Sequence, residues 1–482
     1  MKTLLSVYGI NALAFASNLA AIFVFFSLAG PSGYGSYGIY IVFLAIYYLW
    51  ETSLVKGALF ARSEEKCKGL SDRDADAVAL ASINGSLLPF VLGSCLLVAL
   101  GNFFYPLDSA TGIGGQLIVA VVTIEHLLSY PSNRLVFHLT VAQKFRTIYT
   151  FRLAATLLRH ASAWGVLLVT GSVYWAVIAI TAKGLVIGGI SVWWIAKRYA
   201  YAEGMRFRLR PTYLASTLSF FAAAAAIIVM QELPSLHIDR TYGREALGTY
   251  RLLYDMVAAI WFLATIYPTV LFSYLLSGRE GNKRPKVSQP APYFFEGLAL
   301  FHLTYFLGVC ALITLERSLL EGYFTHIPYA FGVAAGVSLL GYSRFLIETA
   351  QAYGLGRRVL AATLVSIAFV AIVLAMSPSE ITLAEVGWAW LFGQLLFFVL
   401  LKLILLSITT TQIRTFMDAT ILVLPILVVT ICEGVLNPLF LLAISVTGVC
   451  VGLATLLVML RRGLEPESRV STSTPGQDQL RK

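Results

Sequence analysis

Long apolar stretches separated by short polar segments run through most of this 482-residue chain. About fourteen of them lie between Leu4 and Met459, and each is close to the roughly 20 residues that a helix needs to cross a hydrocarbon core. Only a helix satisfies its own backbone N–H and C=O groups where there is no water. The pattern therefore predicts an all-α polytopic membrane protein of about 14 transmembrane helices. The expected spans are 4–29, 37–60, 77–101, 113–140, 149–171, 173–196, 213–232, 249–276, 293–316, 326–349, 358–376, 386–407, 415–436 and 438–460.

The loops between these spans alternate between basic and base-poor. Short loops rich in Lys and Arg resist translocation and stay in the cytoplasm. With the N-terminus inside, the basic segments are all cytoplasmic; they are 61–76, 141–148, 197–212, 277–292, 350–357, 408–414 and the tail after Arg461. The opposite loops hold only Arg240, Arg244 and Arg317, with Arg251 just inside the next helix. We therefore expect an even number of spans and both termini in the cytoplasm.

A weak internal repeat relates helices that lie six spans apart. Gly35-Ser36-Tyr37 opens the second span, and Gly248-Thr249-Tyr250 opens the eighth. Similarly, the sequence LAATL occurs at 153–157 and again at 360–364. An offset of six helices preserves the direction through the membrane, so the repeat is parallel. Chance similarity between apolar segments is the alternative explanation.

This repeat predicts two parallel six-helix lobes around a central cavity, followed by two C-terminal helices. The expected lobes cover residues 1–212 and 213–414, the appended helices cover 415–460, and 461–482 form a disordered cytoplasmic tail. Parallel halves that face each other are typical of carriers in which one half rocks against the other. The organisation thus favours transport by alternating access.

The net charge of +10 lies mostly on the predicted cytoplasmic rim, where it matches anionic lipid headgroups. Its basic runs are split among many loops, which argues against a nucleic-acid surface. The sequence has no phosphate-binding loop, dinucleotide fingerprint or His/Cys metal cluster, and no stretch is typical of a soluble catalytic domain. We therefore expect a protein that is not an enzyme and that uses neither a metal nor another cofactor.

Charged residues inside the predicted spans are candidate functional residues, because each costs about 3 kcal/mol on insertion scales unless it faces protein or water. The cations among them include six that we single out: Lys56, Arg134, Arg159, Lys183, Arg344 and Lys402. Three of them, at positions 56, 344 and 402, lie near cytoplasmic ends, where long side chains can also reach the headgroups. We treat all six as candidate substrate-binding residues.

Two of these cations, Arg159 and Lys183, lie near mid-membrane in the fifth and sixth spans. Two interpretations are open for them: they line a hydrated cavity, or they form structural ion pairs with Glu51 or Glu125. All six cations lie in the middle or the cytoplasmic half if the repeat gives the fold. Such a cavity attracts an anion from the cytoplasm, and a guanidinium can bind phosphate oxygens in a bidentate fork.

Aromatic residues recur in the second and eighth spans. They are Tyr40, Tyr47, Trp50, Tyr254 and Trp261. Their rings could stack on sugars, although packing and interfacial anchoring are the commoner uses of such residues.

Carboxylates within the spans are candidates for ion coupling. Asp255 lies in the outer third of the eighth span, where a carboxylate in low-dielectric surroundings could exchange protons. A structural acid paired with Arg251, one turn earlier, is the alternative. Glu51 and Glu125 are the other two coupling candidates.

Two segments carry a resemblance to a known family. Residues 26–38, FSLAGPSGYGSYG, are similar to the R-x-LGP-x-x-YG-x-Y junction of the Wzx-type polysaccharide flippases, which belong to the multidrug/oligosaccharidyl-lipid/polysaccharide exporter superfamily. Residues 247–254, LGTYRLLY, with Tyr267-Pro268, resemble the eighth helix of that family. The chain departs from it at Ser27, where an arginine is frequent nearby, and at Asp255, where the family is usually uncharged. Arginines typical of lipid II flippases are absent from the first two spans.

The resemblance implies a transporter in the cytoplasmic (inner) membrane of a bacterium. Its expected substrate is an undecaprenyl-diphosphate-linked oligosaccharide, moved from the cytoplasmic to the outer leaflet for polysaccharide or lipopolysaccharide biosynthesis. The resemblance also suggests membrane lipids, a polysaccharide polymerase and glycosyltransferases as partners.

Two other classes of protein remain as alternatives. A polytopic glycosyltransferase, polymerase or ligase would need a long outward catalytic loop, and the longest one expected here, about 233–248, is short. A cation-coupled drug or small-solute exporter of the same superfamily would have a more acidic and less cationic cavity.

Overall fold

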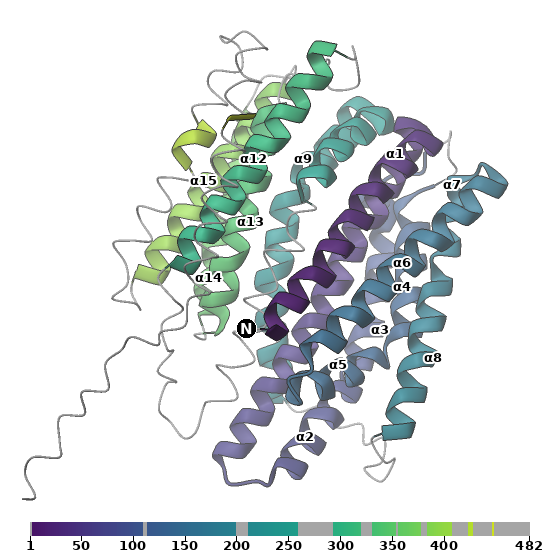
Figure 1. Cartoon of the computed structure of the whole chain (residues 1–482), viewed down its shortest axis with the longest axis vertical. Coiled ribbons are helices and arrows are strands. Elements are labelled where there is room, and N and C mark those ends of the chain that lie inside the picture. The colour runs from purple at the N-terminus through teal and green to yellow at the C-terminus, as the bar shows by residue number, and fades with distance from the viewer. Residues whose placement is uncertain are drawn as a thin grey trace, which may run out of the picture.

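The computed structural model describes residues 2–108, 113–198, 211–258, 293–319, 330–352, 355–376, 383–406, 423–427 and 446–447, and the elements assigned there are helices (Figure 1). They are α1 (Lys2–Cys67), α2 (Asp72–Gly85), α3 (Leu87–Phe104), α4 (Gly115–Ser129), α5 (Ser132–Val141), α6 (Phe145–Thr170), α7 (Val173–Ala179), α8 (Thr181–Arg198), α9 (Pro211–Ala258), α12 (Tyr293–Leu319), α13 (Ala330–Ala352), α14 (Gly356–Met376) and α15 (Leu383–Leu406). Within these ranges, seven helical segments are long and apolar enough to cross a membrane. The predicted all-α polytopic fold is confirmed.

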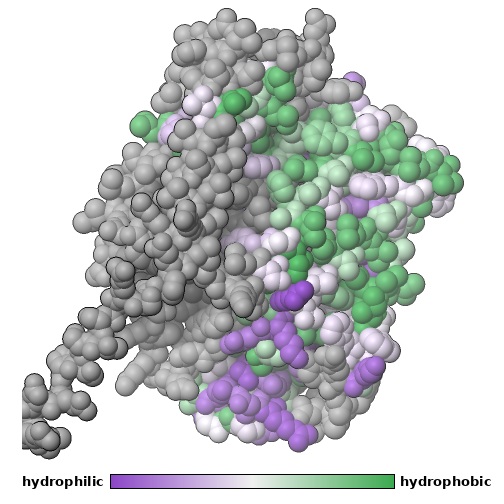
Figure 2. Space-filling model, in the orientation of Figure 1, coloured by the Kyte–Doolittle hydropathy of each residue, from purple (hydrophilic) through white to green (hydrophobic). Residues whose placement is uncertain are grey.

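Apolar side chains cover the outside of the helix bundle. On α3, Leu88, Leu92 and Leu96 are 64%, 62% and 61% exposed, and their spacing of four residues puts them on one face. Figure 2 shows hydrophobic residues over much of the visible face of the first-half helices, with hydrophilic residues gathered at the lower end. This distribution suits a protein surrounded by lipid rather than by water.

Two opposite ends of the bundle can be told apart by the contacts and bends that form them. At one end, where α1 meets α2, Arg62 bonds to Asp72 and Asp76, and Lys66 bonds to Asp72 at 2.9 Å. We call this the basic end. The other end is formed by the bends within α1 and α9 and by the α6–α7 connection, and we call it the bend end (Figure 1).

Both α1 and α9 consist of two helices joined at a glycine. Gly30 has φ 68° and ψ 176°, and Gly243 has φ 84° and ψ −179°, which are backbone angles that only glycine adopts readily. Each glycine precedes its Gly-x-Tyr motif, at Gly35 and Gly248, by five residues. The two motifs paired by the repeat therefore follow similar bends in the chain.

The second helices of α1 and α9 cross where these motifs meet. A Cβ on Gly35 would overlap the Arg244 carbonyl, and a Cβ on Gly248 would overlap the Pro31 carbonyl. Each would also lie 3.1 Å from the backbone nitrogen of the other glycine. The backbones of the two halves are thus in direct contact at the bend end. The exact lobe boundaries at 212 and 414 stay a prediction.

The expected outward loop over 233–248 is wrong, because α9 continues as a helix to Gly243 and resumes directly after it. This stretch instead packs into the protein: Arg240 donates to the Phe103 carbonyl of the first half at 2.6 Å, and Ile238 is 1% exposed. The expected junction over 30–36 is likewise only a bend. Pro31 starts the next helix, a position where its missing N–H is harmless.

Three expected spans are broken rather than continuous. The breaks fall at Ser86 between α2 and α3, at Tyr130-Pro131 between α4 and α5, and at Ile180 between α7 and α8. Pro131 explains the second break, since it has no N–H for the helix ladder. Most of the expected spans 415–436 and 438–460, and the part of 249–276 after residue 258, lie outside the described residues.

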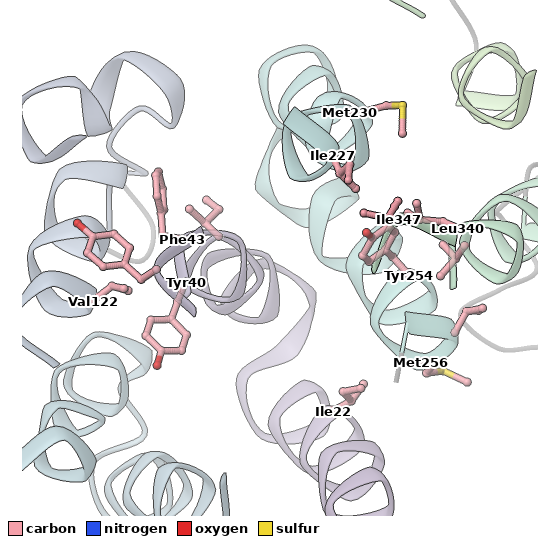
Figure 3. Close-up of a cluster of buried hydrophobic side chains, with 14 of the residues drawn as sticks. Ile22, Tyr40, Phe43, Val122, Ile227, Met230, Tyr254, Met256, Leu340 and Ile347 are labelled. Carbon is pink, nitrogen blue, oxygen red and sulfur yellow. The ribbon is translucent and has the colours of Figure 1, made fainter. Parts of the chain in front are cut away.

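The two halves, α1–α8 and α9–α15, lie side by side and touch mainly through α1 and α9 (Figure 1). Figure 3 shows Tyr40, Phe43 and Val122 on one side, and Tyr254 and Ile347 on the other. Toward the basic end the halves also meet where Tyr213 donates to the Leu54 carbonyl at 3.2 Å, and Lys56 donates to Gln351 at 3.3 Å.

Candidate functional site

A buried cluster of polar side chains bridges the halves just inside the bend end. Arg251 donates one nitrogen to Glu232 at 2.8 Å and another to Asp255 at 2.6 Å. Tyr34, on α1, donates its hydroxyl to the second oxygen of Asp255 at 2.9 Å. We call Tyr34, Glu232, Arg251 and Asp255 the bridging cluster. Its tyrosine belongs to the first half, and its three charged residues belong to α9.

Local packing fixes the arginine of this cluster. The Arg251 guanidinium lies over the Tyr254 ring, 4.6 Å from its centroid, and the residue is 1% exposed. A Cβ on Gly38 would lie 2.8 Å from the Arg251 Cγ, so only glycine leaves room for this side chain. The helix crossing and the cluster are therefore built around the same close approach.

The Asp255–Arg251 ion pair is the structural alternative that the sequence left open, and the structure forms it. Sequence reasoning missed Glu232 and Tyr34, which lay at the end of a predicted span and in a predicted junction. The available signal was Gly243. A glycine bend between two helices brings positions on either side of it together, and here it places Glu232 against Arg251.

A second buried cluster lies inside the first half. Lys183 on α8 contacts Glu125 on α4 at 2.5 Å, and Tyr40 on α1 donates to the other Glu125 oxygen at 2.8 Å. Glu125 is 0% exposed. Gly184 allows this approach, since a Cβ there would overlap the Glu125 carbonyl. In this conformation Lys183 takes the ion-pair arrangement with Glu125, one of the two open interpretations.

Glu51 lies on α1 at half-buried depth. Among the residues that the structure describes, its Oε1 atom is buried and has no hydrogen-bond partner. No described ion pair joins it to Arg159 or Lys183. Its role in ion coupling stays a prediction.

Arg159 has a different environment from Lys183. It donates to the Asn18 side-chain oxygen at 3.3 Å, and the neighbouring His160 also bonds to that oxygen at 3.1 Å. The buried Arg159 Nε has no hydrogen-bond partner, and no carboxylate lies within 4.0 Å of the guanidinium, in the described part of the chain. A half-buried cation that meets only a neutral amide retains its capacity to bind an anion.

The other four predicted cations are spread over both halves. Lys56 contacts Gln351, and Arg344 donates to Gln231 at 3.4 Å. Lys402 lies over the rings of Tyr342 and Phe398, at 5.4 and 5.6 Å from their centroids. Arg134 lies half-buried on α5. Each cation thus has its own set of neighbours, and the structure does not gather the six into one cluster.

The candidate stacking aromatics are packed inside the protein. Tyr40, Tyr47 and Tyr254 are at most 2% exposed, and Trp50 is 8% exposed, while Trp261 lies outside the described residues. Tyr37 stacks on Tyr40 with 5.6 Å between ring centroids. The packing interpretation describes these rings in this conformation.

In the described part of the chain, no group of three or more His, Cys, Asp or Glu side chains could hold a metal ion.

A third polar contact, also missed from the sequence, closes the bend end. Arg244 bonds to Asp239 at 2.8 Å, and it reaches across to Ser36 and to the Pro106 carbonyl, each at 3.2 Å. Arg244 and Asp239 both lie on α9, whereas Ser36 and Pro106 belong to the first half. Together with the bridging cluster, this contact holds the halves together at the bend end.

Comparison with known proteins identifies the fold. No family model matches the chain, and no curated protein sequence matches it. Several solved structures do resemble it. A mutant form of the Vibrio cholerae MATE transporter VcmN is 14% identical, with a TM-score of 0.58 over 86% of this chain and 100% of its own. The eukaryotic MATE transporter AtDTX14 is 14% identical, with a TM-score of 0.54 over 86% of this chain and 97% of its own. The outward-facing conformation of a multidrug resistance MATE transporter of the MOP superfamily is 15% identical, with a TM-score of 0.55 over 87% of this chain and 96% of its own. The chain therefore has the fold of the MATE transporters.

Proposed function

We propose that the protein is a flippase that moves an undecaprenyl-diphosphate-linked oligosaccharide from the cytoplasmic to the outer leaflet of a bacterial inner membrane. It works without covalent chemistry, by alternating access between two lobes, with both termini in the cytoplasm. Membrane lipids surround it, and a polysaccharide polymerase and glycosyltransferases are its partners in the pathway. The observation that carries the proposal is the environment of Arg159.

Arg159 is suited to an anionic substrate because its charge is not already neutralised by a described carboxylate. A diphosphate offers several oxygens to a guanidinium, and the bidentate geometry gives both affinity and orientation. Asn18 supplies a neutral acceptor that holds the guanidinium in place without competing as a charge. Lys183 supports this site less well, since Glu125 already neutralises it.

The contacts between the halves support an alternating-access cycle. At the bend end the halves are joined by the Gly35–Gly248 crossing, the bridging cluster and the Arg244 contact. All of these are side-chain or close-packing contacts between α1, the α3–α4 segment and α9, with no covalent link other than the chain itself. Separation of α1 from α9 would open this end to a substrate in transit.

A cation-coupled drug exporter is the second candidate, and one observation favours it. The bridging cluster holds two carboxylates and one guanidinium, so its formal charge is −1. An exporter of cationic drugs is expected to have an acidic cavity. A negatively charged cluster between the halves is closer to that expectation than the cationic cavity that the sequence predicted. One of the similar structures is a multidrug resistance transporter.

The test of the proposed function is the fate of lipid-linked sugars in a deletion strain. Completed repeat units should accumulate on the cytoplasmic leaflet, protected from a membrane-impermeant lectin, because synthesis continues while translocation stops. If the units are accessible from outside, a polymerase or ligase replaces the flippase as the better explanation. If none accumulates and susceptibility to cationic drugs rises, the drug exporter does.

A further inference from the structure

A second guanidinium on α6 lies without a described anionic partner. Arg152 lies over two aromatic rings, 5.5 Å from the Tyr48 centroid and 5.4 Å from the Tyr149 centroid. Among the residues that the structure describes, no hydrogen bond or ion pair reaches Arg152, and Glu51 interacts with it only through charge. Aromatic faces attract a cation without neutralising it. These contacts therefore hold the guanidinium in place and leave its N–H donors for an anion.

Arg152 and Arg159 lie on the same face of α6. They are seven residues apart, which is close to two helical turns and a rise of about 10 Å. The opposite face of α6 carries apolar side chains that suit lipid, among them Leu157 and Leu168, which are 48% and 67% exposed. Both arginines are half-buried. They therefore face the protein rather than the lipid, so headgroup anchoring does not account for Arg152.

The two arginines lie at different depths between the two ends of the bundle. The connection from α6 to α7 belongs to the bend end, so the start of α6 points toward the basic end (Figure 1). Arg152 is thus the nearer of the two to the basic end, which the charge pattern predicts to be cytoplasmic. An anion that enters from the cytoplasm would meet Arg152 first and Arg159 second.

One diphosphate is too short to occupy both positions. Tyr48 and Tyr149 hold one guanidinium and Asn18 holds the other, so the helix rise of about 10 Å keeps them apart. We infer that Arg152 is an entry site for the diphosphate of an isoprenyl-linked substrate, which binds there and then moves two turns along α6 to Arg159. The inference rests on the proposed function for the substrate and for the role of Arg159.

The experiment measures binding of farnesyl diphosphate, a short lipid diphosphate without sugar, to the full-length protein in phosphatidylcholine nanodiscs by isothermal titration calorimetry. Farnesol, which lacks the diphosphate, is the reference for partitioning into lipid. The association constants of two alternative sites add, so Arg152→Ala and Arg159→Ala should each weaken binding only about twofold for sites of similar affinity. The double variant should weaken it at least about tenfold, because both charged partners are lost.

Matched controls separate this site from loss of charge or of folding. Arg146→Ala removes an exposed charge from the same helix, and Arg146→Ala/Arg159→Ala should bind like Arg159→Ala alone. Each single variant should unfold at the wild-type temperature and still bind, so that a loss confined to the Arg152→Ala/Arg159→Ala variant reports on the two sites.

Three results would overturn the inference. In the first, the Arg152→Ala/Arg159→Ala variant binds as well as Arg159→Ala, so Arg152 contributes nothing. In the second, each single variant already loses about tenfold and the losses multiply, which means that both arginines hold one diphosphate together. In the third, the wild type binds farnesyl diphosphate no better than farnesol. The expected binding pattern in a protein that does not flip lipid-linked oligosaccharide would support the two sites and contradict the proposed function alone.

Discussion

The ion pair between Lys183 and Glu125 makes a sharp prediction about which mid-membrane cation binds substrate. Lys183→Met leaves Glu125, which is 0% exposed, without its cation and with Tyr40 as its bonding partner. Removing one partner of a buried pair costs about 3–5 kcal/mol, whereas replacing both with uncharged residues of similar size is often close to neutral. The double variant Lys183→Met/Glu125→Gln should therefore recover most of the loss. The side-chain carbonyl of the introduced glutamine would still accept the Tyr40 hydrogen bond.

The assay is denaturant unfolding of the four proteins of this double-mutant cycle in detergent micelles. We expect each single variant to be destabilised by about 3 kcal/mol or more, and the coupling energy to be of similar size. Substrate flipping by the double variant should stay near the wild-type level. Stable single variants that have lost transport would refute this reasoning and return Lys183 to the substrate site.

Two further predictions address the crossing and the topology. Gly248→Ala should destabilise the protein by about 1–3 kcal/mol in the same unfolding assay, because its Cβ meets the Pro31 carbonyl, while Gly165→Ala, with open space around it, should not. Topology reporters fused after residues 68, 204, 284 and 470 should behave as cytoplasmic and those after 108, 240 and 380 as exported; an exported signal at 284 or 470 would contradict the even number of spans.

The membrane fold could be predicted from the sequence because the length and apolarity of a span follow directly from the bilayer. The repeat could be seen at Gly35 and Gly248, because close backbone approach demands glycine at both positions. The helix over 233–242 could not be predicted in this way. Polar residues such as Asp239 and Arg240 are typical of a loop, and only the fold brings them to their partners, Arg244 and the Phe103 carbonyl.

The candidate site shows the same division between local and tertiary information. A charge inside an apolar run is visible in the sequence, so Arg159, Lys183 and Asp255 could be found. Their partners are set by packing between helices far apart in the chain, so the sequence could not decide between a cavity and an ion pair. In the structure the two residues of the same predicted role have different partners: Lys183 meets Glu125, and Arg159 meets Asn18.

The most direct measurement is the flipping of a fluorescent undecaprenyl-diphosphate-linked oligosaccharide in proteoliposomes that contain the purified protein. Wild type should move the label across the bilayer, Arg159→Ala should reduce the rate at least about tenfold, as expected for the loss of a charged hydrogen-bonding group, and Arg159→Lys should restore part of it. Arg146→Ala, which removes an exposed charge from the same helix, serves as the control and should keep the wild-type rate. Failure of the wild-type protein to flip this lipid, or an unchanged rate in Arg159→Ala, would contradict the account.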